Sequence, residues 1–135
     1  MRLFVTAALA CALLACSTAL ALPPIPAYIK ESLSDKPEYK AYVGQLAEAK
    51  DKCVSCHKPG LDKAKTKGHA LNDFGQAMHK VLDDKGFMMA HKEKDAAKAL
   101  KLFNEAWSKA IEEKNADGEK YGDLIRAGKL PGKNE

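Results

Sequence analysis

The feature that most constrains this chain is a run of five residues near its middle, Cys53-Val54-Ser55-Cys56-His57. In the C-x-x-C-H pattern, both thiols add across the vinyl groups of one haem, and the adjoining imidazole binds the iron. The thiols must reach neighbouring vinyl groups along one edge of the ring, and the histidine must then turn under the ring. A single helical turn meets both requirements. The pattern predicts one covalently attached haem c, held by Cys53 and Cys56, with His57 as the proximal iron ligand.

Two other kinds of site use similar residues. A thioredoxin-like dithiol requires a strand before the cysteines and a helix after them, within a βαβ unit. The sequence predicts no strand before Cys53. A zinc site requires four ligands, and the chain beyond its leader offers only Cys53, Cys56, His57 and at most His69. Haem attachment is therefore the preferred interpretation.

The first 21 residues have the pattern of a secretory signal peptide. Arg2 gives a basic start, residues 3–15 are apolar, and Ala19-Leu20-Ala21 is an A-x-A cleavage site. The mature chain is predicted to begin at Leu22 and to function in the periplasm or an equivalent compartment outside the cytoplasm.

Two alternatives for the leader stay open. Leu13-Leu14-Ala15-Cys16 resembles a lipoprotein box, which would anchor the protein through a lipid on Cys16. Residues 3–22 are uncharged and long enough to span a membrane if they are retained. No membrane span is expected in the mature chain.

Helical periodicity dominates the rest of the chain and predicts an all-α fold with three main helices in one domain over residues 35–135. Residues 22–34 are predicted to be an extended, proline-rich lead-in, because prolines lack an amide proton and have a fixed φ. The first helix is expected to open at Asp35, with Glu38 completing a capping box, and to carry an apolar stripe as far as Cys53.

Two further helices are predicted, over about 71–84 with Asn72 as N-cap and over about 95–114. Residues 87–91 between them are interpreted as a short apolar connection. Residues 121–126 are expected to add a short helical stretch before Gly128.

Lysines are concentrated around and after the motif, where residues 61–68 are predicted to form a loop. They are Lys50, Lys52, Lys58, Lys63, Lys65 and Lys67. Such a loop is either a solvated surface or a basic rim that steers an acidic redox partner protein to the haem edge. The net charge of the whole chain is only +4, so no nucleic-acid partner is expected.

The order of these features resembles the small single-haem cytochromes c of class I. A helix running into C-x-x-C-H, a loop, a middle helix, a Met-bearing segment and an aromatic C-terminal helix are shared, over roughly residues 35–114. The resemblance implies that Phe103 and Trp107 pack the last helix across the first.

The sixth iron ligand is expected in the segment between the middle and last helices, as the resemblance implies. Met88 or Met89 is the first candidate there, and His69 is the alternative. Met78 is interpreted as a core residue because it shares an apolar helical face. His79, next to it, is expected to point to solvent.

Haem iron held by two axial ligands changes little in geometry between its oxidation states, which favours electron transfer. The predicted function is therefore that of an exported one-electron carrier and not of an enzyme. Two alternatives remain: a haem with an open or weakly held sixth position that binds a small gas or peroxide, and a haem subunit of a larger redox complex.

Overall fold

The computed structural model describes residues 25–49, 53–58 and 70–132. Within these ranges the chain forms six α-helices and one 3-10 turn, and no strand. The elements are α1 (Ile25–Leu33), η1 (Pro37–Tyr39), α2 (Lys40–Glu48), α3 (Asp73–Val81), α4 (Asp84–Lys92), α5 (Ala96–Ala110) and α6 (Tyr121–Arg126). The described residues thus have the predicted all-α character, with six helices in place of three main ones.

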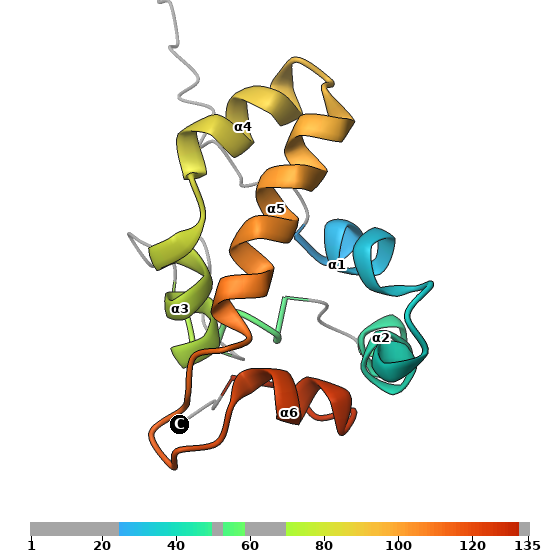
Figure 1. Ribbon diagram of the computed structural model, residues 1–135, viewed down its shortest axis with the longest axis vertical. Coiled ribbons are helices and arrows are strands. Elements are labelled where there is room, and N and C mark those ends of the chain that lie inside the picture. The colour runs from blue at the N-terminus through green and yellow to red at the C-terminus, as the bar shows by residue number, and fades with distance from the viewer. Residues whose placement is uncertain (1–24, 50–52, 59–69, 133–135) are drawn as a thin grey trace, which may run out of the picture.

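The longest helix, α5, runs through the middle of the molecule (Figure 1). Helices α1, α3 and α4 pack against it, and α6 packs against α2. No described helix is long and apolar enough to cross a membrane.

Aromatic side chains of α5 join the other helices into one core. Phe103 lies 5.9 Å from Tyr28 of α1, between ring centroids, and stacks on Trp107 at 5.7 Å. Trp107 in turn lies 6.3 Å from Tyr42 of α2 and 5.5 Å, edge to face, from Phe74 of α3. Such pairs contribute about 0.5–1.5 kcal/mol each beyond the area they bury. Trp107 packs on Tyr42 of the first predicted helix, as the resemblance implies, whereas Phe103 contacts Tyr28 of α1.

The extended lead-in predicted for residues 22–34 is wrong for Ile25–Leu33, which is helix α1. Pro26 lies in the first turn, where a missing amide proton breaks no intrahelical hydrogen bond. Tyr28, Ile29 and Leu33 are buried, so the helix docks through an apolar face onto α2 and α5. The packed unit therefore begins before residue 35.

The first predicted helix is shorter than expected at both ends. Its start is the 3-10 turn Pro37–Tyr39, whose N-cap residue Lys36 makes no side-chain cap hydrogen bond, so the predicted capping box is absent. Helix α2 then ends at Glu48 and does not reach Cys53. The C-x-x-C-H motif instead forms a separate turn, which lies between α2 and α3 in Figure 1.

Asn72 is the N-cap of α3, as predicted, but the helix ends at Val81 and a new one begins at Asp84. The prediction of a connection over 87–91 is wrong, because these residues belong to α4. The Asp83 carboxylate accepts a hydrogen bond of 3.1 Å from the Gly86 amide and caps this helix. Phe87 and Ala90, three positions apart, are buried on its inner face.

The C-terminal part follows its prediction closely. Asp95 caps α5, accepting from the Lys98 amide at 3.0 Å, and α6 spans Tyr121–Arg126.

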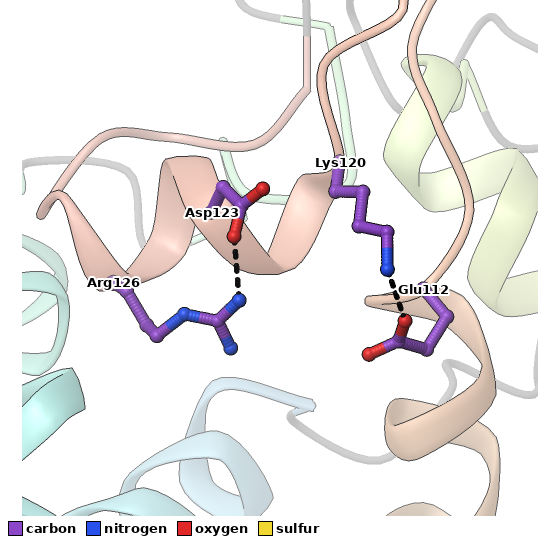
Figure 2. A network of polar contacts seen from close by, with 4 residues as sticks. All are labelled: Glu112, Lys120, Asp123 and Arg126. Atoms are coloured by element: carbon purple, nitrogen blue, oxygen red, sulfur yellow. Dashed lines mark hydrogen bonds and ion pairs between the residues drawn. The ribbon is translucent and has the colours of Figure 1, made fainter.

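Figure 2 shows two ion pairs near the C-terminus, one in the turn between α5 and α6 and one within α6. Lys120 bonds Glu112 at 2.7 Å, and Arg126 bonds Asp123 at 2.6 Å. Both pairs are exposed to solvent, so their contribution to stability is small.

Candidate functional site

The backbone of the motif closes one helical turn. The Cys56 and His57 amides donate to the Cys53 carbonyl at 3.1 and 2.9 Å. This is the local geometry that the C-x-x-C-H pattern requires, because it presents the two cysteines and the histidine on one turn.

A buried hydroxyl pair ties this turn to α2. Ser55, in the middle of the motif, is buried, and its Oγ lies 2.6 Å from the Tyr42 hydroxyl. Burial raises the pKa of Tyr42 far above its ordinary value, so the phenol stays protonated. Tyr42 also touches Trp107, so the motif is connected through it to the aromatic core.

Asn72 ties the turn to α3. Its side-chain amide donates to the Val54 and Ser55 carbonyls at 3.1 and 3.2 Å, and its backbone amide donates to the Cys56 carbonyl at 2.9 Å. Its Oδ1 accepts from the Gly75 amide at 2.8 Å, which is the cap of α3. This one fully buried side chain therefore both starts the helix and satisfies the carbonyls of the motif.

Two glycines allow the close approach. A Cβ at Gly75 would lie under 3.0 Å from the Cys56 carbonyl oxygen, and one at Gly132 would meet the Asn72 side chain equally closely. Gly132 and Pro131 are buried, so the C-terminal segment covers Asn72 from the far side.

The residues before and after 59–69 are hydrogen-bonded to each other. His57 and Leu71 form an antiparallel bridge, and the Lys58 amide donates to the Ala70 carbonyl at 2.9 Å. The motif is thus held by contacts with α2, with α3 and with residues 70–72.

The two cysteines form no disulfide. Burial, and to a smaller extent the neighbouring Cys53, raise the pKa of Cys56 to about 12, so this thiol is neutral at physiological pH. In a dithiol redox centre the attacking thiol has a lowered pKa. The raised pKa of Cys56 therefore does not suit the role of the attacking thiol.

The motif opens into two cavities. Cys56 and His57 line one of about 50 Å³, together with Met78 and His79 of α3 and Asp84 of α4. Cys53 lines the other, of about 430 Å³, between α1 and α2; its walls include Ile29, Lys30, Val43 and Leu46.

Ile25 borders the smaller cavity and Pro26 the larger, so both cavities meet the first turn of α1.

The candidate sixth ligands fall in different places. Met88 and Met89 lie on α4, Met89 is 56% exposed, and neither lines the cavity beside His57. Met78 is 4% exposed and belongs to the core, as predicted. His79 is exposed, as predicted, yet it borders the cavity. His69 lies outside the described residues.

Several other predictions concern residues outside the described ranges. They are the leader over 1–21, the loop over 61–68 and all of the basic rim from Lys50 to Lys67 except Lys58, which is exposed.

No family model, curated protein or solved structure matches this chain. The function has to be argued from the site itself. Among the described residues, no three His, Cys, Asp or Glu side chains gather where they could hold a bare metal ion. A haem differs from such an ion because the macrocycle itself supplies four ligands to its iron.

Sequence reasoning missed the residues that hold the motif in place. Tyr42 was assigned to an apolar stripe, Ser55 received no role, and Asn72 was expected to act only as a cap. One local signal was available: Gly75 occupies the first turn of a helix, where glycine is unfavourable, so its presence indicates a close backbone contact.

Proposed function

We propose that this chain is an exported c-type cytochrome with one haem attached to Cys53 and Cys56 and ligated by His57, and that it carries single electrons. The observation that supports this most directly is the folded motif: the C-x-x-C-H residues form one closed helical turn that opens into two cavities.

The donor set matches the group. The thiols of Cys53 and Cys56 and the imidazole of His57 stand on one turn, as thioether attachment and axial ligation need. The cavity beside Cys53, at about 430 Å³, is within the roughly 300–1,000 Å³ of cofactor sites. The smaller cavity beside His57 must widen to admit a ring. The smaller cavity borders Ile25 and the larger borders Pro26, so we expect the first turn of α1 to move outward.

The supports of the motif favour electron transfer. Bound haem supplies the ferrous–ferric couple, and the protein sets the position of its ligands. Tyr42, Asn72 and Gly75 hold the turn from two helices, which keeps His57 in one place in both oxidation states. A site that changes little in geometry suits electron transfer better than substrate chemistry.

The expected setting follows from the sequence. The leader over residues 1–21 would direct the chain out of the cytoplasm. Haem would be attached to Cys53 and Cys56 in that outer compartment. The partner is expected to be an acidic redox protein that meets the lysine-rich side of the motif, of which Lys58 is exposed.

The test is an absorption spectrum of the oxidised and reduced holoprotein, with and without carbon monoxide. A carrier gives low-spin spectra in both states and a ferrous spectrum that carbon monoxide leaves unchanged. A high-spin spectrum that shifts with carbon monoxide would show an accessible sixth position and would favour gas or peroxide binding over electron carriage.

A further inference from the structure

We propose that His79 is the second axial ligand, so that His57 and His79 bind the iron from opposite faces of the ring. This inference rests on the proposed haem attachment. It assigns the sixth iron ligand to His79, whereas the sequence predicts Met88 or Met89, with His69 as the alternative.

The first argument is the face of α3 on which His79 stands. Asn72, Gly75 and His79 are separated by three and four positions, so they share one side of the helix. The first two touch the motif directly, Asn72 through hydrogen bonds and Gly75 by van der Waals contact with Cys56. His79 follows one turn later, about 6 Å further along the axis. It borders the same cavity as His57.

The second argument is the orientation of its ring. His79 Nδ1 lies 2.9 Å from Oδ2 of Asp84. Because a carboxylate only accepts, Nδ1 of the neutral ring carries the proton and Nε2 keeps its lone pair for a metal. Histidines that bind metals almost always donate their other ring N–H to such a group.

Asp84 is suited to this role by its place in the fold. Asp84 is the first residue of α4 and follows Leu82, the C-cap of α3, by two positions. It also borders the cavity. Its second oxygen, Oδ1, is buried without a hydrogen-bond partner among the described residues. Its Oδ2 is the atom that contacts His79 Nδ1, so this carboxylate can orient the ring.

The neighbouring methionine is a weaker choice. Met78 also borders the cavity, but it is 4% exposed and packed in the core, so binding iron would remove it from its contacts. The His79 side chain is 54% exposed, so binding iron would remove it from no core contact.

The assignment has a chemical consequence. A thioether ligand raises the potential of haem, so a second imidazole in its place gives a lower potential. The protein would then exchange electrons with a low-potential partner.

The experiment uses the holoprotein and four variants: His79→Ala, Asp84→Asn, Met78→Leu and, as matched control, His91→Ala. His91 is an exposed histidine of α4 whose ring nitrogen bonds the Tyr28 hydroxyl at 3.0 Å. Intact mass establishes haem attachment in each variant before spin state is measured by absorption and electron paramagnetic resonance.

The parent is expected to be low-spin and to lack the weak red band of ferric methionine-ligated haem. His79→Ala should become high-spin and return to low spin on addition of imidazole. Asp84→Asn should stay low-spin but bind cyanide, which competes for the same position, about 10- to 100-fold more tightly. Met78→Leu and His91→Ala should match the parent.

The proposal is overturned if His79→Ala carries haem and remains low-spin, or if the parent shows the methionine band and Met78→Leu abolishes it. A change to high spin in His69→Ala alone would likewise assign the ligand to His69. None of these results contradicts the proposed haem attachment. That proposal is contradicted only if the parent protein itself carries no haem.

Discussion

The close contact between α3 and the motif predicts that Gly75→Ala destabilises the protein. A Cβ at this position would lie 2.9 Å from the carbonyl carbon of Cys56 and nearer still to its oxygen. Restoring the 3.4 Å of an ordinary contact to that carbon alone moves helix and motif apart by at least about 0.5 Å, and the nearer oxygen requires more. The Asn72 bonds of 3.1 and 3.2 Å then lengthen beyond about 3.6 Å, where no hydrogen bond remains.

The magnitude follows from the bonds that are lost. The two side-chain bonds and the weakened backbone bond of Asn72 contribute about 0.5–1.5 kcal/mol each. Alanine returns up to about 1 kcal/mol of helix propensity relative to glycine. The free energy of unfolding should therefore fall by about 1–3 kcal/mol, which lowers the urea midpoint by about 1 M for a chain of this size.

The assay is urea denaturation followed by circular dichroism, with Gly44→Ala as the control. Gly44 lies in α2, and a Cβ there meets nothing within 4 Å. That variant should be as stable as the parent or up to about 1 kcal/mol more stable. If Gly75→Ala shows the same stabilisation as Gly44→Ala, the close packing of α3 on the motif is refuted.

Three further predictions concern the same network. Tyr42→Phe leaves the buried Ser55 hydroxyl without its 2.6 Å partner and should lower the free energy of unfolding by about 1–2 kcal/mol in urea titrations; an unchanged midpoint would contradict this. Asn72→Ser keeps a capping oxygen but loses both side-chain donations to the motif, so it should be less stable than the parent by about 1–3 kcal/mol. A stability equal to that of the parent would show that these two hydrogen bonds do not stabilise the fold. The haem-free chain, made without its leader, should lose stability as pH rises from 9.0 toward 12, because folding raises the pKa of Cys56 over that interval. Cys56→Ala should reduce the loss between pH 9.0 and 10.0, whereas the loss above pH 10.0 should persist because burial also raises the pKa of Tyr42 and Tyr121. Equal losses in parent and variant between pH 9.0 and 10.0 would exclude the buried thiol.

The parts of the fold that local sequence signals determine were predictable. Asn72 and Asp95 cap helices because they stand just before amphipathic runs, and α6 follows from a short pattern bounded by glycine. Helix α1 was hidden because the prolines before and within its first turn outweighed the apolar positions Tyr28, Ile29 and Leu33.

Helix α4 was hidden for a different reason. Gly86 and the apolar run around it indicate a connection, whereas the Asp83 cap and burial of Phe87 and Ala90 against α5 determine a helix. That burial is a tertiary effect, which overrides local propensity.

The candidate site was likewise predictable from the sequence only in part. The local turn of Cys53 to His57 follows from the motif itself. The pairing of Ser55 with Tyr42, and the approach of His79 to His57, join residues 13 and 22 positions apart in the sequence and depend on how α2 and α3 pack. No periodicity in one segment encodes such contacts.

The central proposal is tested most directly by the intact mass of the protein, purified from a host that can attach haem to exported proteins. The account predicts a mature chain carrying exactly one haem, which denaturation does not remove, and a Cys53→Ser, Cys56→Ser variant that carries none. A parent chain that leaves such a host with two unmodified cysteines would contradict it.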